Sequence, residues 1–344
     1  MARANRVAAH NVGRAGGAIT PQTEIAFRVL MSGFYQTLGC QRLNGRMKHD
    51  RDSFRLLPPL TPLQQHPQFA AALAGMGRPM KKITLPHGGS AQVMERRFWP
   101  VHWPLRLVSR GPIWEGPATA AQMLDGVTTL RRRGVQIINN ENVPGDVMKA
   151  AGYRQIMTPA TIAVLDLRGT YADWLAAMTA KWRNALRRAE YAGLTVDVAP
   201  FSRADHKWIL EADEDQQSTR GYQALPGALT QSYAVMNRDA TFVVTASDGA
   251  TPVAAMIFLR HGTAATYQIG WTSVIGRSLR AHNLCLSTGM DILAEAGVKA
   301  IDLGVIDTEN NPGLARFKLG SGAKPVVLGG SWIALPWLRP KPLA

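Results

Sequence analysis

Two arginines spaced by one helical turn are the first residues whose type and spacing suggest chemistry. Arg183 and Arg187 lie in a stretch with helical patterning that begins at Thr170 and ends at Gly193. Paired guanidinium groups suit the oxygens of a phosphate, so this pair is a candidate substrate-binding site. The alternative is a solvated helix face on which Glu190 offsets part of the charge.

The histidines and cysteines weigh against several other chemistries. The eight histidines are scattered, with neither a His-x-x-x-His pair nor a Ser-His-Asp arrangement. Cys40 and Cys285 are far apart and match no metal-binding or redox spacing. Metal-dependent hydrolysis and nucleophilic triads are therefore poor hypotheses, and no metal is expected. The sparse cysteines favour a reduced, cytoplasmic protein.

The elements that must position any site occur twice. The pattern N-x-P-G-x6-G runs from Asn142 to Gly152 and again from Asn310 to Gly320. Each copy follows a Gly-Val that begins an apolar run, and the offset between copies is 163 to 168 residues. That offset is far longer than a solenoid repeat and fits two copies of one domain. A chain of 344 residues is also long enough for two ordinary cores.

The net charge of +15 favours an anionic partner such as nucleic acid, nucleotide phosphates or a membrane surface. Residues 1–51 hold eight basic and two acidic residues, so +6 belongs to this segment and +9 to the rest. The segment predicts either a disordered basic tail or a misassigned start, because Met47 precedes the first clear patterning at Phe54. No run of about 18 apolar residues occurs, so no transmembrane segment is expected.

Beyond residue 51, strand and helix patterns alternate. We predict an N-terminal domain over 52–168, a C-terminal domain with the active cleft over 169–335, and a tail over 336–344. In the first domain we expect helices at 63–76 and 119–133 and strands at 53–57, 81–85, 91–98, 105–109, 135–139 and 162–167, the last closing the unit. In the second we expect helices at 170–193, 278–296 and 312–318 and strands at 194–198, 241–246, 253–259, 264–269 and 300–303.

This order resembles the GNAT acyltransferase fold, and particular residues resemble its FemABX family. Residues 181–190 (KWRNALRRAE) resemble the family's R-x-x-I-R-K-A-E helix, and 297–322 resemble its C-terminal signature of Asp-Leu-Gly, Phe-Lys and glycines. Residues 62–65 (PLQQ) and 110–112 (RGP) resemble its N-terminal landmarks. The similarity covers about 53–333. It implies an α/β (α+β) fold of tandem GNAT-like domains, each a mixed, mostly antiparallel sheet flanked by helices.

The resemblance implies transfer of an acyl group to an amine by direct attack. Members move an amino acid from aminoacyl-tRNA to a peptidoglycan-precursor peptide, and relatives use acyl-CoA, so the donor is a co-substrate and no cofactor is permanently bound. A tetrahedral intermediate carries negative charge on oxygen, which requires a fixed cation or backbone donors. Lys318, in the Phe-Lys pair, is the candidate for that role; a solvated lysine is the alternative. Asp302 is a candidate base, with a structural hydrogen-bond acceptor as its alternative.

The turn before the helix at 278–296 bears on the donor. Users of acyl-CoA in this superfamily carry a Q/R-x-x-G-x-G/A turn there, whose backbone amides hold pyrophosphate. Residues 274–283 contain one glycine, which argues against an ordinary CoA cradle and makes tRNA a candidate partner. Arg277, Arg280 and Asn283 remain candidates for holding a donor phosphate.

Further candidates for substrate binding are Tyr267, on a central strand, and Gln65 and Arg110, in the N-terminal landmarks. The acceptor is expected to be an amine on a peptide, a cell-wall precursor or a small molecule. Two other classes of function stay open: a non-catalytic RNA-binding protein on a degenerate transferase fold, and a protein that contacts a membrane surface peripherally. Only the second N-x-P-G copy has the Phe317-Lys318 pair, so we expect the chemistry there.

Overall fold

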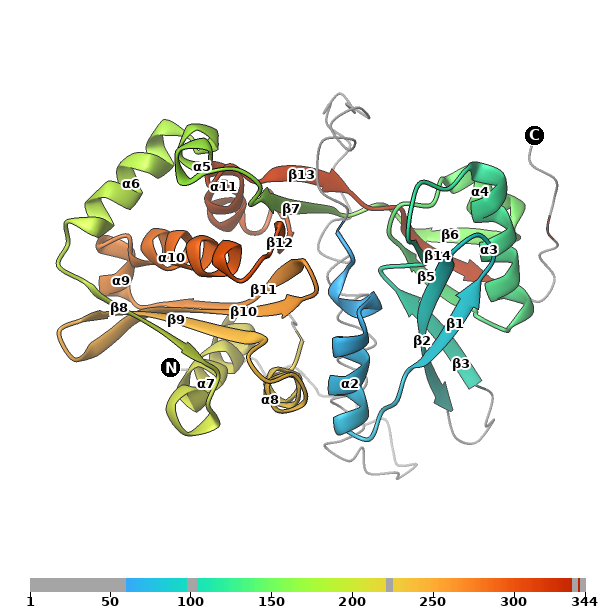
Figure 1. The fold of residues 1–344 in the computed structure, drawn as a ribbon, viewed down its shortest axis with the longest axis horizontal. Coiled ribbons are helices and arrows are strands. Elements are labelled where there is room, and N and C mark those ends of the chain that lie inside the picture. The colour runs from blue at the N-terminus through green and yellow to red at the C-terminus, as the bar shows by residue number, and fades with distance from the viewer. Residues whose placement is uncertain (1–59, 98–103, 221–224, 336–339, 341–344) are drawn as a thin grey trace, which may run out of the picture.

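The computed structural model describes residues 60–97, 104–220, 225–335 and 340. The segment 1–51, the strand expected at 53–57 and the tail over 336–344, apart from Pro340, lie outside these residues. The molecule is elongated, with two sheets side by side and their helices around them (Figure 1). No helix in the described ranges is both long and apolar enough to cross a membrane.

The first sheet has the strand order β1-β2-β3-β5-β14-β6, with the short β4 paired to β2. Helices α3 (Ala120–Arg132) and α4 (Gly145–Ala150) cover one face, where Val93, Val108 and Ile138 form a core. The strands are β1 (Lys81–Leu85), β2 (Gly89–Arg97), β3 (Pro104–Ser109), β4 (Ile113–Trp114), β5 (Ile137–Asn140), β6 (Tyr153–Met157) and β14 (Gly330–Ala334).

The second sheet has the order β13-β7-β12-β11-β10-β9-β8 and is covered by helices on both faces. Its strands are β7 (Thr161–Asp166), β8 (Thr195–Pro200), β9 (Thr241–Asp248), β10 (Thr251–His261), β11 (Ala264–Thr272), β12 (Ala300–Val305) and β13 (Lys324–Val327). Its helices are α5 (Tyr171–Ala177), α6 (Ala180–Glu190), α7 (Arg203–Arg220), α8 (Gly227–Met236), α9 (Val274–Ser278), α10 (Ala281–Glu295) and α11 (Pro312–Gly320).

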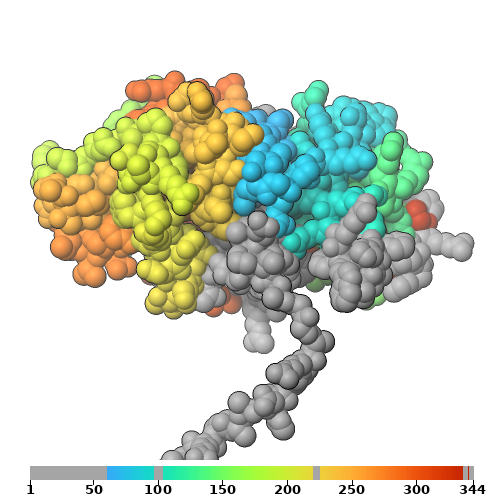
Figure 2. All heavy atoms as spheres, turned by 90° about the horizontal axis from the view of Figure 1, so that it is seen from below, coloured from blue at the N-terminus to red at the C-terminus, as the bar shows by residue number. Residues whose placement is uncertain are grey.

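A short 3-10 helix (Leu63–Gln65) and α2 (Pro67–Gly75) lie between the two halves (Figures 1 and 2). The apolar side chains Leu63, Phe69 and Leu73 are buried in the cluster beneath α7 and α8, not in the core of the first sheet. The segment that opens the described chain therefore packs mainly on the second half.

The two sheets repeat one strand order. The set β2-β3-β5-β14-β6 matches β10-β11-β12-β7-β13, and in each set the second and third strands are parallel while all other neighbours are antiparallel. The predicted fold class, two similar halves with mixed, mostly antiparallel sheets flanked by helices, is confirmed.

Each half gives one strand to the other sheet. The strand expected at 162–167 forms as β7, but it pairs with β12 and β13, so its placement as the closing strand of the first unit was wrong. In return, β14 pairs with β5 and β6. The linker 158–160 contains Pro159 and no glycine for a tight reversal, so the chain runs onward into the other sheet. Leu328 N donates to Ala160 O at 2.8 Å, so the two crossing linkers lie side by side.

The helix expected over 170–193 is broken in two. Its start is as predicted, because Thr170 and Asp173 form a capping box in which Thr170 N donates to Asp173 Oδ2 at 2.7 Å. Met178 is extended, and Thr179 accepts from Trp182 N at 3.4 Å to begin α6. The apolar side chains of this stretch stay on one buried face, because Trp174 and Met178 before the break and Trp182 and Leu186 after it are all buried.

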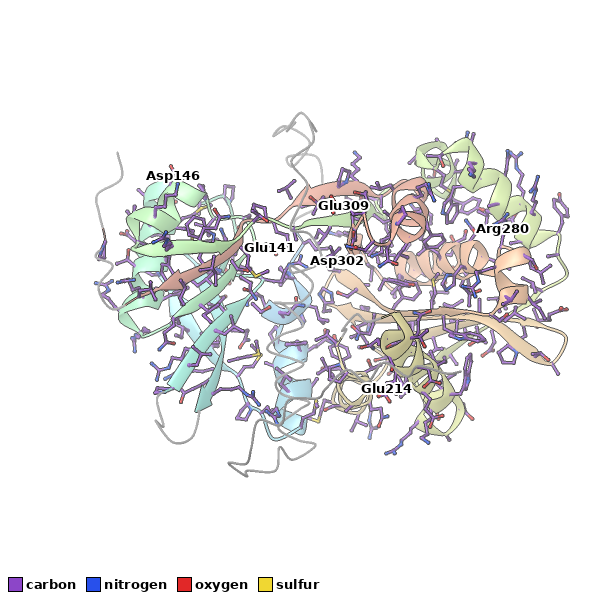
Figure 3. The ribbon with its side chains drawn as sticks, turned by 180° about the vertical axis from the view of Figure 1, so that it is seen from behind. Glu141, Asp146, Glu214, Arg280, Asp302 and Glu309 are labelled. Atoms are coloured by element: carbon purple, nitrogen blue, oxygen red, sulfur yellow. The ribbon has the colours of Figure 1, made fainter. Side chains whose placement is uncertain are left out.

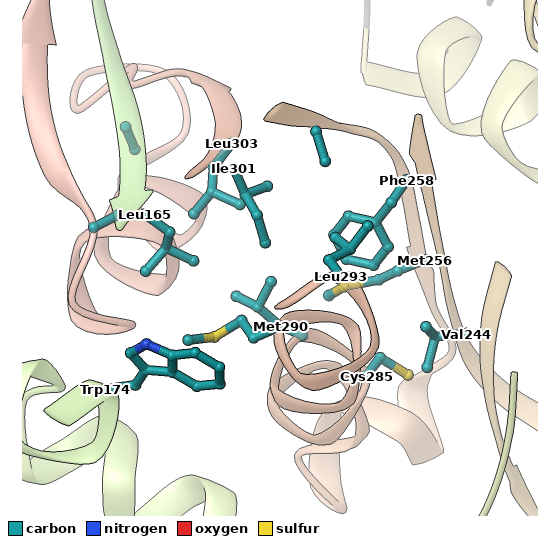
Figure 4. Close-up of a cluster of buried hydrophobic side chains, with 14 of the residues drawn as sticks. Leu165, Trp174, Val244, Met256, Phe258, Cys285, Met290, Leu293, Ile301 and Leu303 are labelled. Carbon is teal, nitrogen blue, oxygen red and sulfur yellow. The ribbon is translucent and has the colours of Figure 1, made fainter. Parts of the chain in front are cut away.

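The core of the second half lies between the sheet and α10 (Figure 4). Gly289 lets α10 approach the sheet closely, since a Cβ there would lie 2.5 Å from the Phe258 ring. Cys285 is buried in this core, and burial raises the pKa of its thiol to about 12. A thiol held protonated in this way is a packing residue and not a nucleophile.

Candidate active site

A cavity of about 80 Å³ lies where the two sheets meet. One wall comes from the ends of β3 and β5 and from β14, and the other from β7, β11 and β12. Residues of both halves of the repeat therefore face the same space. A cavity of this size holds a group of only a few heavy atoms.

The two parallel strand pairs present equivalent positions to the cavity. Ser109 on β3 lies opposite Asn139 on β5, and Thr266 on β11 lies opposite Asp302 on β12. Asn139 and Asp302 each follow the glycine of their Gly-Val by five residues. The pairing of β11 with β12 ends at Thr266 and Asp302, so the cavity occupies the place where these strands separate.

A buried ion cluster joins the halves at this cavity. Arg110 donates through Nη1 to Asp302 Oδ2 at 2.9 Å and through Nη2 to Glu141 Oε1 at 2.8 Å, and its Nε also bonds Glu141. The three side chains are 6 to 13% exposed. Figure 3 shows Glu141 and Asp302 on opposite sides of the junction between the sheets. Arg110 is therefore the cation that links the first sheet to the second.

The pKa values of Arg110 and Glu141 each reflect burial and the charges of the other members of the cluster. Burial on its own would lower the pKa of Arg110, but Glu141 and Asp302 raise it above its ordinary value. Burial raises the pKa of Glu141, and Arg110 opposes that shift. Arg110 also has a φ of 54°, a left-handed conformation that costs a non-glycine residue about 1–3 kcal/mol. A strained, fully paired cation at a cavity indicates a functional site.

Polar side chains in the cavity wall lack partners within the described part of the chain. Asn139 makes no hydrogen bond through either amide atom, and Ser331 makes none through Oγ. They are 8% and 1% exposed, and they lie directly opposite each other on β5 and β14. A buried polar group without a partner costs about 1–3 kcal/mol, so these atoms suit a polar ligand.

Sequence reasoning missed this wall. Asn139, Asn140 and Glu141 directly follow the apolar run of β5, and a polar triplet at a strand end was the available signal. Ser331 had no such signal, because its position beside Asn139 depends on the exchange of β14 between the sheets.

Lys318 lies behind the end of β12 and does not line the cavity. Its Nζ donates to Val305 O at 2.9 Å, and the residue is 6% exposed, so the alternative of a solvated lysine is wrong. Burial lowers the pKa of Lys318 to about 8, while Asp302 opposes that shift. Asp302 Oδ1 also accepts from Gly304 N at 2.7 Å. Both oxygens of Asp302 are thus occupied, as expected for a positioning residue, and its role as a base remains a prediction.

A β-bulge on β11 faces the same cavity. Ile257 on β10 pairs with Ile269 and Phe258 pairs with Tyr267, so Gln268 is the extra residue. A bulged residue leaves the regular ladder of backbone hydrogen bonds, and its groups become available to a ligand. Tyr267 and Gln268 both line the cavity, in agreement with the predicted placement of Tyr267 on a central strand.

Two predicted binding residues serve the fold in this structure. Gln65 is buried and joins two strands, since Nε2 donates to Ser109 O at 2.6 Å and Oε1 accepts from Gln92 N at 2.8 Å. Its neighbour Gln64 lines the cavity instead. Arg183 donates to Leu175 O at 3.0 Å and to Met178 O, which are carbonyls at the end of α5.

The remaining predicted residues lie outside the cavity wall. Arg187 is exposed on α6, and Arg277 and Arg280 are exposed beside the start of α10 (Figure 3 labels Arg280). Asn283 is buried in the first turn of α10. The structure therefore brings Asp302, Arg110 and Tyr267 together in one cavity. A binding role for the residues on α6 and around the start of α10 remains a prediction.

Comparison with known proteins shows which family and which folds the chain resembles. Residues 176–319 match the acetyltransferase (GNAT) domain family. No curated protein sequence matches the chain. The crystal structure of FemX is similar with a TM-score of 0.66 and 13% identity, over 85% of this chain and 96% of FemX. This similarity concerns the tandem fold.

Two further structures are more distant. The C-terminal domain of a putative lysylphosphatidylglycerol synthetase from Agrobacterium fabrum has a TM-score of 0.49 and 15% identity, over 80% of this chain and 89% of its own. A tandem GNAT protein from the clavulanic acid biosynthesis pathway has a TM-score of 0.43 and 13% identity, over 72% of this chain and 79% of its own.

Proposed function

We propose that this chain, whose tandem fold is similar to that of FemX and whose residues 176–319 match the acetyltransferase (GNAT) domain family, is an N-acyltransferase that moves an aminoacyl or acyl group to an amine in the cavity between its sheets. The observation that carries this proposal is the cavity at the separation of β11 and β12, with a fixed cation, a bulged strand and polar groups that have no partner among the described residues around it. A site of this size would hold the carbonyl and the amine that react, and such a site gains most of its rate from orientation and preorganised charge.

The reaction requires no covalent intermediate on the protein. The amine nitrogen attacks the acyl carbonyl carbon, a C–N bond forms, and the carbonyl oxygen becomes an oxyanion. Collapse of this intermediate breaks the bond to the leaving oxygen or sulfur, and the leaving atom takes up the proton that the amine loses. In this proposal the backbone N–H of Gln268 binds the oxyanion, and Lys318 adds positive charge from behind the cavity wall, where its Nζ donates to Val305 O. Asp302 holds Arg110 and the β12 end in place.

Asn139 and Ser331 orient a reactant in this scheme. An amide side chain offers both a donor and an acceptor, and a hydroxyl offers the same pair. Because these atoms are unpartnered in the described residues, a ligand would satisfy them without breaking an existing bond. Asn139 and Ser331 are therefore expected to hydrogen-bond a polar group of one reactant, beside its reacting carbonyl or amine.

We favour aminoacyl-tRNA as the donor, with acyl-CoA as the second candidate. The one glycine of the turn before α10 is Gly276, and a Cβ there would lie 2.1 Å from Val253 O. Gly276 is therefore required for packing on β10, which leaves no glycine for close approach of a pyrophosphate. The net charge of +15 also suits a nucleic-acid donor.

A transfer assay tests the proposal. The full chain is incubated with total tRNA charged with radiolabelled amino acids, or with acyl-CoA pools, and with peptidoglycan precursors and simple amines as acceptors. We expect consumption of one donor that depends on an acceptor. No consumption of either donor by folded protein would refute the proposal. A salt-dependent affinity for tRNA that ignores its aminoacylation would instead support a non-catalytic RNA-binding protein.

A further inference from the structure

A second concave surface lies on the first half, away from the proposed active site. It is a groove of about 540 Å³ between the edge strand β1, the start of β3 and the end of α3. These elements lie together at the end of the molecule formed by the first sheet (Figure 1). On β2 and β3, Arg106 lies opposite Glu95 and Val108 lies opposite Val93, all on the face of the sheet that the helices cover. The groove therefore adjoins that face. Ser109, which lines the cavity, is on the other face.

The groove carries a strong excess of positive charge. It is lined by five basic residues and one acid, Glu95: the basic residues are Lys81, Lys82, Arg106, Arg132 and Arg133. Lys81 pairs with Val93 and Lys82 with Gln92, so the side chain of Lys82 lies on the opposite face of the sheet and four cations face the groove. Of these, Lys81, Arg132 and Arg133 are exposed. Within the described residues, none of these three forms an ion pair with an acid. Their charges are therefore available to a ligand.

One cation of the groove is held in a fixed position. Arg106 Nε donates to Glu95 Oε2 at 2.9 Å, and Nη1 donates to Arg133 O at 2.6 Å. Gly134 makes room for this guanidinium, because a Cβ there would lie 3.0 Å from Arg106 Nη1. A preorganised guanidinium loses little entropy when it binds a phosphate oxygen.

Structural roles can explain the cations of each strand or helix separately, without a ligand. Lysines on an edge strand prevent pairing with other sheets, and arginines at a helix C-terminus stabilise the helix dipole. Neither explains why the cations of three elements converge on one groove with a single acid. Like charges placed together repel each other, so their convergence favours an anionic ligand.

The shape of the surface decides between anionic partners. Contact with a membrane interface inserts exposed apolar side chains, but in this groove Ile83 is only partly exposed and Val93 is 2% exposed. A groove suits a linear ligand. Among the described residues no aromatic side chain lines it, so the contacts would be to phosphates and not to stacked bases.

We propose that this groove binds a phosphodiester chain through its phosphates, without sequence specificity, and that the ligand is a strand of RNA. The site is separate from the acyl-transfer cavity and does not depend on the proposed function. If the donor is a tRNA, the groove would add a second contact to it. Another linear polyphosphate would present the same chemistry and is distinguished by competition.

Fluorescence anisotropy with a labelled single-stranded RNA of twelve nucleotides tests the proposal on the full chain. Four cations predict a log–log salt slope of at most about −2.8, so affinity should fall by at most about 50-fold between 50 and 200 mM salt. Lys81→Gln should make the slope shallower by about 0.7, whereas Lys82→Gln, on the other face of the sheet, should leave it unchanged. The variant Arg132→Gln/Arg133→Gln should make the slope shallower by about 1.4 from the other wall.

The matched control is Arg238→Gln/Lys299→Gln, which removes the same charge from exposed positions on the second half. If it weakens binding as much as the groove variants, net charge explains the affinity and the proposal fails. Absence of RNA binding at 50 mM salt also refutes it. Displacement of RNA by inorganic polyphosphate but not by tRNA would reassign the ligand, and preferential binding to anionic vesicles would overturn the choice of RNA.

Discussion

The two halves of the molecule bring equivalent strand ends to one cavity but place different chemistry on them. The first half offers Asn139 on β5, and the second offers Asp302 at the matching position on β12. Two residues before the closing glycine of each N-x-P-G copy, the first half has a buried Ala150 and the second a buried Lys318. At these two matched positions the first half is neutral and the second is charged, which indicates that the first orients a reactant and the second stabilises charge.

The largest effect is expected from breaking the link between the halves. Arg110→Met would leave Glu141 and Asp302 buried without their cation, and removing one partner of a buried ion pair costs about 3–5 kcal/mol. We expect a loss of that size in the free energy of unfolding, measured by urea denaturation, and loss of transfer activity.

A double variant serves as its control. Arg110→Met/Glu141→Gln removes one of the two stranded acids and should recover part of the lost stability. Equal stability of the single and double variants would show that the cluster does not act as a unit.

The charged half is tested by Lys318→Met, which keeps the length of the side chain. Loss of one stabilising group at an oxyanion lowers kcat by about 10²–10³-fold. We therefore expect a large fall in kcat with the fold retained, measured in the transfer assay and by circular dichroism. An unchanged kcat would remove Lys318 from the mechanism.

The same variant makes a prediction about pH. The pKa of Lys318 is about 8 in the folded protein and about 10.5 when unfolded, so between these values the unfolded state binds more protons. Stability of the native protein should therefore rise with pH from 8 to 10.5 relative to Lys318→Met, by at most about 3 kcal/mol. Parallel stability curves for the two proteins would contradict the buried, depressed lysine.

The smallest effect is expected at the polar wall formed by β5 and β14. Ser331→Ala removes a buried hydroxyl that has no partner among the described residues, and it should stabilise the ligand-free protein by about 1 kcal/mol while raising KM. Thr230→Val is the matched control, because Thr230 Oγ1 is also buried and unpartnered in the described residues but lies outside the cavity. It should raise the melting temperature without changing KM. A change of KM in both variants, or in neither, would sink the assignment.

Much of the fold could be predicted because its signals are local or repeated. The N-x-P-G repeat indicated two halves, and Thr170 marked a helix start through its own side chain. The break at Met178 was missed, since its apolar period continues through the break and only Thr179 marks it. The exchange of β7 and β14 could not be read from the chain, because a strand's pattern of side chains does not say which neighbour it will pair with.

The site was predicted where residues match the landmarks of the FemABX family. Asp302 and Arg110 were named through that resemblance, and the structure places Arg110 Nη1 2.9 Å from Asp302 Oδ2 although 192 residues separate them. Asn139 was missed because an amide carries no charge, and its value comes from having no partner among the described residues after folding. Burial of Lys318 likewise depends on the packing of α11 behind β12 and not on its neighbours in the chain.

The exchange of β7 and β14 has a consequence for how reactants enter. Each half completes the hydrogen-bond ladder of the other, but no pair of the described strands joins the two sheets themselves. Swinging the sheets apart to admit a reactant would therefore leave both ladders intact; it would bend the two crossing linkers and break the bond from Arg110 to Asp302. Unfolding either half would disrupt both sheets, so the halves should unfold together in a single cooperative transition.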